Sequence, residues 1–129
     1  MSYQEAYGNY HEVNLDSQTA RATPVELVLL LTDGLLDELA RVRGHIVGKR
    51  YEQKAVGIDK CCEIINGLSS SLDFDGGGET VVNLANLYDF CSARLQSAGI
   101  KMDPSMVDEV VGVLSTIRQG WQGVQARNA

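Results

Sequence analysis

Apolar residues recur at intervals of three and four along most of the chain, and this spacing predicts helices. The first such stretch, residues 24 to 47, is also the most apolar. Its main line of apolar side chains consists of Val28, Leu31, Leu35, Leu39, Val42 and Ile46. This spacing is close to the heptad seam of helices that pack side by side. We therefore expect this line to face the core of a helical bundle.

The start of this first helix carries a clear local signal. Thr23 is placed to cap the helix, Pro24 suits its first position and Glu26 completes a capping box. We expect the helix to run to about Val47, with Gly48 in the left-handed position that often follows a helix.

Three further helices are predicted, over residues 50 to 72, 79 to 98 and 104 to about 125. Gly99 is expected to end the third helix, while Asp103 and Pro104 begin the fourth. The glycine-rich stretch "DFDGGGE" is a flexible connection. The expected seams are Tyr51, Ala55, Ile58, Cys62, Ile65 and Leu72; Val81, Leu84, Tyr88, Cys91 and Leu95; and Val107, Val110, Leu114, Ile117, Trp121 and Val124.

These elements predict an all-α fold, an antiparallel four-helix bundle over residues 23–129. Residues 1–22 are expected to form a separate N-terminal arm or short capping helix. Tyr3, Tyr7 and Tyr10 are spaced so that they share one face of a helix. A frayed terminus is the alternative, but three tyrosines so close together favour an arm that docks on a surface.

The first helix carries more apolar side chains than one seam needs. A second apolar line, about 100° around the helix from the first, consists of Leu29, Leu36, Ala40 and Val47. Ile64 and Leu68, with Cys61, flank the seam of the second helix, and Leu87 and Phe90 flank that of the third. These residues either form the edge of a wide core or line a groove that accepts an amphipathic segment of a partner.

Composition and charge narrow the choice of partner. The chain has a net charge of −6 and no cluster of Lys and Arg, so nucleic acid is not expected to bind. No apolar run approaches the ~20 residues that span a bilayer, so no membrane insertion is expected. The first residues lack the basic and apolar regions of a signal peptide. Three cysteines, two of them adjacent, make a poor disulfide framework and indicate a reducing cytoplasm.

The residue patterns that carry catalysis are missing from the sequence. Glu-x-x-His pairs, which di-iron bundles need, do not occur, and His11 and His45 are far apart. Cys61 and Cys62 are adjacent, which is not the spacing of zinc ligands, and "DGGGE" is not followed by the remainder of a P-loop. We therefore expect neither an enzyme nor a bound metal or cofactor.

Four motifs in order resemble the flagellar export chaperone FliS family. They are "AYGNY" near the start, "ATPVELVLLLTDGLLDEL", "NLANLYDFCSARL" and a final helix with Trp121. The resemblance covers essentially the whole chain. It departs from the family pattern at Thr32, where a tyrosine is usual, and at Leu31, where methionine is common.

The resemblance implies a bacterial cytoplasmic chaperone that binds the disordered C-terminal segment of flagellin in hydrophobic grooves. Covering this segment prevents premature polymerisation and aids delivery to the flagellar type III export apparatus. The N-terminal arm is implied to cap part of the groove when no client is present. The partner-binding residues expected on this basis are Tyr7, Tyr10, Leu29, Leu36, Ala40, Val47, Ile64, Leu68, Leu87 and Phe90.

Two alternatives remain open at this point. The second apolar line can be covered by another copy of the chain, which predicts a homodimer or a larger structural or regulatory bundle without a flagellin client. The arm can either compete with the client or contact it. A metalloenzyme bundle is disfavoured by the missing ligands.

Overall fold

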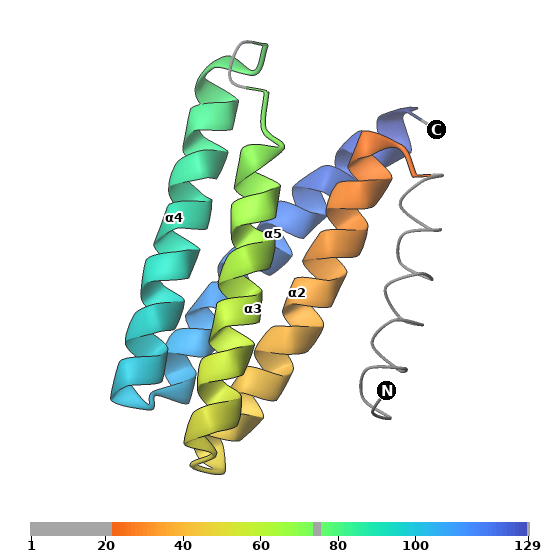
Figure 1. Ribbon diagram of the computed structural model, residues 1–129. Coiled ribbons are helices and arrows are strands. Elements are labelled where there is room, and N and C mark those ends of the chain that lie inside the picture. Colours follow the sequence, from red (N-terminus) through yellow and green to blue (C-terminus); the bar gives the residue numbers. More distant parts are fainter. Residues whose placement is uncertain (1–21, 74–75, 129) are drawn as a thin grey trace, which may run out of the picture.

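The computed structural model describes residues 22–73 and 76–128, and within these ranges it contains four helices and no strand (Figure 1). Labelled as in Figure 1, they are α2 (Pro24–Val47), α3 (Tyr51–Ser70), α4 (Gly78–Lys101) and α5 (Pro104–Asn128). The predicted all-α bundle is confirmed. Residues 1–21 of the predicted N-terminal arm, including Tyr7 and Tyr10, lie outside the described residues.

The four helices run alternately up and down and form a ring (Figure 1). α2 packs against α3 and α5, and α4 packs against the same two helices from the other side. At the lower end in Figure 1 the helices lie close together. Toward the upper end α2 and α5 lean away from α3 and α4.

Each helix contributes a line of four buried side chains to the core at alternating intervals of three and four, and α5 adds Met106 beside its line. This alternation keeps one narrow stripe of each helix facing its neighbours. The residues are Leu35, Leu39, Val42 and Ile46 of α2; Ile58, Cys61, Ile65 and Leu68 of α3; Tyr88, Cys91, Leu95 and Ala98 of α4; and Val107, Val110, Leu114 and Ile117 of α5.

The first half of α2 departs from the predicted seam. Thr32 is 1% exposed, whereas Val28 and Leu31 are only partly buried. A polar residue is tolerated inside because its hydroxyl donates a hydrogen bond to the Val28 carbonyl oxygen at 2.7 Å. The expectation that only apolar residues form this seam was therefore wrong at its N-terminal end.

The predicted seam of α3 is also wrong in phase. Ile58 and Ile65 are buried as expected, but Cys61 and Leu68 complete the line, while Tyr51 is 59% exposed. Ile58 and Ile65 belong both to the predicted seam, which contains Cys62, and to the observed line, which contains Cys61 and Leu68. The packing of α3 against α2 determines which of these two lines is buried. Gly57 faces α2 so closely that an added Cβ atom would lie 2.7 Å from Cγ2 of Val42.

The helix ends match the predictions in part. The Thr23 hydroxyl accepts a hydrogen bond from the Glu26 backbone N–H at 3.1 Å, as predicted for a cap. Asp103 and Pro104 begin α5, and the Asp103 carboxylate accepts from the Ser105 N–H at 2.9 Å. The left-handed residue after α2, however, is Lys49 and not Gly48.

Gly99 does not end its helix, contrary to the prediction. It lies within α4 and is buried against α3, where an added Cβ atom would lie 2.5 Å from Cδ1 of Ile58. Its carbonyl oxygen accepts a hydrogen bond from Lys54 Nζ at 2.9 Å. Gly99 therefore serves the close contact of α3 with α4, and α4 continues to Lys101 before Met102 adopts the left-handed conformation.

Replacement of Gly57 by alanine is expected to destabilise the protein. Alanine favours a helix over glycine by about 1 kcal/mol, but a clash with a fully buried, conformationally stiff valine costs about 1–3 kcal/mol. We expect Gly57→Ala to lower the free energy of unfolding by about 1 kcal/mol, measured by urea denaturation.

Gly112→Ala is the matched control, because nothing lies within 4 Å of an added Cβ atom there. It is expected to raise the free energy of unfolding by roughly 0.5–1 kcal/mol. Equal stabilisation by both substitutions would contradict the close packing of α2 on α3.

The three cysteine thiols are expected to differ in reactivity. Burial raises the pKa of Cys61 to about 12 and that of Cys91 to about 11, and both side chains are inaccessible. Cys62 is partly exposed, and burial raises its pKa as well. Since the thiolate is the reactive form, a disulfide reagent at pH 8 should label the native protein slowly and only at Cys62. Cys62→Ser should remove this labelling, and fast labelling of more than one thiol would contradict the described core.

Candidate functional site

The second apolar line of α2 runs along the side of the helix that faces α5. Two ion pairs mark this side. Arg118 of α5 donates from Nε to Oδ1 of Asp33, and Arg43 donates from Nε to Oδ1 of Asp108 of α5 at 2.8 Å. Asp33 and Arg43 lie on either side of the line around the helix, so the line borders the α2–α5 contact.

Burial varies along this line. Leu29 is only 8% exposed, so the prediction that it lies off the buried side of the helix is wrong. Asp33, one turn further on, is paired with Arg118 of α5. Leu36 is partly buried and packs against the core, whereas Ala40 is exposed and Val47 is 61% exposed.

The predicted contact residues of α3 are less accessible than expected. Leu68 is 1% exposed and belongs to the core, which corrects its placement beside the seam. The cause is the shifted phase of α3, which turns this residue inward. Ile64 is partly buried and packs against the core from the edge.

Leu87 and Phe90 of α4 are the accessible pair of the predicted set. They are 40% and 43% exposed and lie one turn apart. The guanidinium carbon of Arg94 lies 5.8 Å from the centre of the Phe90 ring, and Arg94 Nε donates to Glu109 of α5 at 2.7 Å. This pair therefore borders the contact of α4 with α5.

The predicted contact residues do not form one groove within the described part of the chain. Leu36, Ala40 and Val47 lie on the α2 side of α5, and Leu87 and Phe90 lie on its α4 side. Tyr7 and Tyr10 lie outside the described residues. The predicted contact residues that are exposed are consequently divided between two faces of the bundle.

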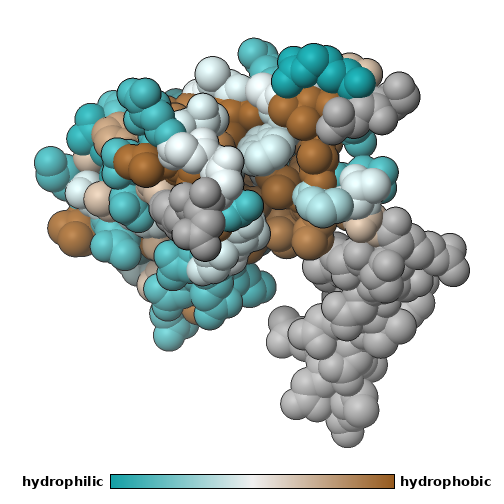
Figure 2. Space-filling model, turned by 90° about the horizontal axis from the view of Figure 1, so that it is seen from above, coloured by the Kyte–Doolittle hydropathy of each residue, from teal (hydrophilic) through white to brown (hydrophobic). Residues whose placement is uncertain are grey.

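An apolar cavity at the open end of the bundle was not predicted from the sequence. Its volume is about 370 Å³, and Figure 2, which looks onto this end, shows apolar surface around the hollow. The lining side chains come from all four helices and from the residues that follow α3. They include Val25, Val28 and Leu31 of α2; Leu68 of α3; Leu72 in the connection after α3; Val81, Leu84 and Tyr88 of α4; and Trp121 of α5.

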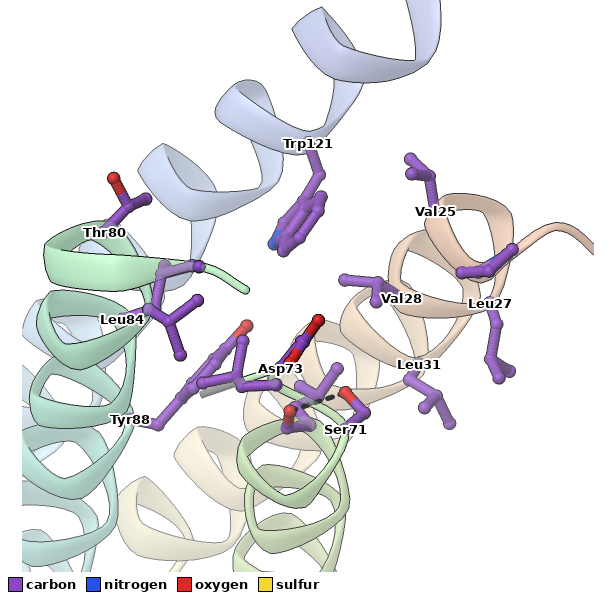
Figure 3. A pocket seen from close by; sticks show the side chains of 15 residues that line it. Val25, Leu27, Val28, Leu31, Ser71, Asp73, Thr80, Leu84, Tyr88 and Trp121 are labelled. Atoms are coloured by element: carbon purple, nitrogen blue, oxygen red, sulfur yellow. Dashed lines mark hydrogen bonds between the residues drawn. The ribbon is translucent and has the colours of Figure 1, made fainter. Parts of the chain in front are cut away.

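Side chains from α2, α4 and α5 converge on this end cavity (Figure 3). Val28, Leu84 and Trp121 enter it from three directions, and the Tyr88 ring approaches from below. Asp73 contributes the charged group of the lining, and its carboxylate also accepts a hydrogen bond from the Gly76 N–H at 3.1 Å.

The indole N–H of Trp121 is buried, and no acceptor among the described residues meets it at full hydrogen-bond geometry. The Tyr88 hydroxyl is close enough for the indole to act on it as a hydrogen-bond donor. Burial raises the pKa of the Tyr88 phenol, and the neighbouring indole acts in the opposite direction.

One sequence signal is consistent with the end cavity. The run Gly76–Gly78 connects α3 to α4 at this end, and glycines have no side chains with which to fill the space between diverging helices. The predicted seams nevertheless placed Val28, Leu31, Leu84 and Trp121 in a closed core. The divergence of the helices leaves them partly buried instead.

The described residues offer apolar contact surfaces but no cluster suited to metal chemistry. No three His, Cys, Asp or Glu side chains among them come close enough to hold a metal ion. None of the four described helices is long and apolar enough to cross a membrane. The exposed apolar side chains Val47, Leu87 and Phe90 can contact an apolar partner by burial of surface.

Comparison with known proteins agrees with this description. Residues 6–128 match the model of the family described as flagellar protein FliS. Flagellar secretion chaperone FliSB of Pseudomonas aeruginosa is 37% identical over 120 residues, which cover 93% of this chain and 95% of that protein. Flagellar secretion chaperone FliS of Salmonella typhimurium is 34% identical, covering 92% and 88%.

A solved structure supports the same fold. The crystal structure of a flagellar chaperone from bacteria superposes with a TM-score of 0.76 at 17% identity, and covers 98% of this chain and 99% of the other. The named relatives belong to a chaperone family and not to an enzyme family. Since the family model spans nearly the whole chain, this protein belongs to the FliS family of flagellar proteins.

Proposed function

We propose that the protein is a flagellar secretion chaperone of the bacterial cytoplasm, and that its client is the disordered C-terminal segment of flagellin. The observation that carries this proposal is the match of residues 6–128 to the family, together with relatives named as flagellar secretion chaperones. The bound segment is kept from polymerising and is delivered to the flagellar type III export apparatus. No catalytic step is involved.

Apolar burial provides the affinity in this proposal. Burying one leucine or phenylalanine side chain contributes on the order of 1.5–3 kcal/mol, and several such anchors offset the cost of ordering a disordered segment. Val47, Leu87 and Phe90 are large apolar side chains that are already exposed. They are available to a client without opening the bundle, whereas Leu29 and Leu68 are buried.

The position of the exposed residues favours a client that wraps around the bundle. Leu87 and Phe90 border one side of α5, and Leu36, Ala40 and Val47 border the other. A single short helix in one groove cannot reach both sides. A long disordered segment can, by forming short amphipathic helices that are joined by extended residues.

Two further contacts are part of the proposal. Tyr7 and Tyr10 contact either the client or the surface that the client occupies. The exposed residues of α2 also allow a homodimer when no client is present, which light scattering of the isolated protein would detect.

Replacement of Leu87 and Phe90 by serine tests the client surface. Both side chains are about 40% exposed, so the double variant should leave the core intact. Loss of two partly buried anchors is expected to weaken the binding of a C-terminal flagellin segment roughly 10- to 100-fold in titration calorimetry.

Val56→Ser is the matched control, because Val56 is 58% exposed on α3 and is not among the proposed contacts. It should leave the dissociation constant unchanged. An unchanged dissociation constant in the Leu87 and Phe90 double variant, with an unchanged melting temperature, would remove this pair from the proposed site.

A further inference from the structure

The closed end of the bundle, at the bottom of Figure 1, is formed by two neighbouring segments, residues 48–54 and 100–104. The first connects α2 to α3, and the second connects α4 to α5. Two large apolar side chains project from this end into solvent, since Ile100 is 84% exposed and Tyr51 is 59% exposed. We propose that the closed end contacts an anionic lipid surface, end-on and without insertion of a helix.

The charge of the closed end is opposite to that of the whole chain. It contains four cations and two carboxylates, whereas the chain has a net charge of −6. The cations are Lys49, Arg50, Lys54 and Lys101, and the carboxylates are Glu52 and Asp103. None of these cations forms an ion pair within the described part of the chain. The closed end therefore presents a net positive charge to a surface that it meets.

Lys54 brings the exposed apolar side chains and the two segments together. Its Nζ donates to the Gly99 carbonyl oxygen at 2.9 Å and lies 5.8 Å from the centre of the Tyr51 ring. Ile100 follows Gly99 directly and lines the same hollow as Lys54. A tyrosine ring with its polar tip, and lysine and arginine with their long apolar stems, suit the boundary between lipid headgroups and acyl chains. The closed end thus combines the side chains that a peripheral membrane contact needs.

The acidic remainder of the chain does not prevent this contact. α4 has 24 residues and is therefore about 36 Å long. Acidic groups at its other end, such as Glu79, lie several Debye lengths of about 8 Å from a surface at the closed end, so salt screens them. Arg43 and Asp108, which lie nearer, are paired with each other. The positive groups consequently dominate the field at the closed end.

The shape of the closed end favours a lipid surface over an acidic protein segment. Ile100 and Tyr51 project from the ends of helices. The hollow beside Ile100, between α3 and α4, is lined in part by Asp59 and Gln96, so an acidic segment lying in it would meet a carboxylate. A bilayer stays outside the hollow and still reaches the projecting side chains and the cations.

End-on contact leaves the sides of the bundle accessible. Leu36 and Ala40 of α2 and Leu87 and Phe90 of α4 lie more than one helical turn away from the closed end. The protein can therefore rest on a membrane with or without a client. The inference goes beyond the proposed function and does not depend on it.

Co-sedimentation of the full-length chain with lipid vesicles tests this contact. At low ionic strength, vesicles of phosphatidylglycerol and phosphatidylcholine in equal parts should bind the protein, and vesicles of phosphatidylcholine alone should not. Because the attraction acts between exposed charges, added salt should release the protein.

Two substitutions with matched controls locate the contact. Lys101→Glu and Arg127→Glu each reverse a cation in the last turn of a helix, but at opposite ends of the bundle. Each Lys or Arg near an anionic surface strengthens binding about fivefold. Lys101→Glu is therefore expected to weaken vesicle binding roughly 5- to 25-fold, and Arg127→Glu to leave it unchanged. Ile100→Ser should weaken it about threefold, whereas Val82→Ser, at the other end of α4, should not change it.

Binding that requires phosphatidylglycerol, is reversed by salt and depends on Lys101 supports the inference. It is overturned if the wild-type chain fails to co-sediment with these vesicles at low ionic strength, or if Arg127→Glu weakens binding as much as Lys101→Glu. A wild-type chain that ignores the vesicles but binds polyglutamate, with loss of this binding in Lys101→Glu, would assign the closed end to an acidic protein and also overturn the inference.

The substituted side chains are all exposed, so the melting temperature should change little. If Lys101→Glu does not fold, Lys101→Gln removes the same cation and should weaken vesicle binding about fivefold. Unchanged binding of a folded Lys101→Gln variant would then count against the inference.

Discussion

The α2 helix has to bury apolar side chains against two neighbours, α3 on one side and α5 on the other. Gly57 lets α3 approach until its backbone nearly touches Val42, and ion pairs from Asp33 and Arg43 mark the contact with α5. One seam cannot serve both contacts, which explains the broad apolar surface of this helix. The exposed ion pairs themselves add little stability, so apolar packing holds the ring together.

The fold could be predicted because helix spacing is a local property of the sequence. Intervals of three and four, the Thr23 cap and the Asp103–Pro104 start specify four helices without reference to their neighbours. Which side of a helix is buried depends on its neighbours in the folded protein, so this was harder to predict. Ile58 and Ile65 lie on two possible lines, and only the close approach at Gly57 selects the one with Cys61 and Leu68. Thr32 was missed because a local hydrogen bond satisfies its hydroxyl.

The candidate site was less predictable than the fold. Leu87 and Phe90 are exposed apolar residues that a helical projection identifies, since they lie beside their own seam and not on it. Leu29 is buried although it lies away from the seam, because burial depends on the neighbouring parts of the chain, which a projection of one helix does not include. The end cavity arises from the angle at which the helices diverge. Neither the periodicity of any one helix nor the composition of the chain specifies that angle.

The order of the ring has a consequence for folding. The contact between α2 and α5 joins segments that are far apart in sequence, and such contacts form late because a long loop must be closed first. Trp121 stands on α5 and Val28 on α2, so the end cavity is assembled only by this long-range contact. A growing chain can form α2, α3 and α4 before Trp121 of α5 is in place to line the cavity. Formation of the end cavity is thus coupled to completion of the tertiary structure.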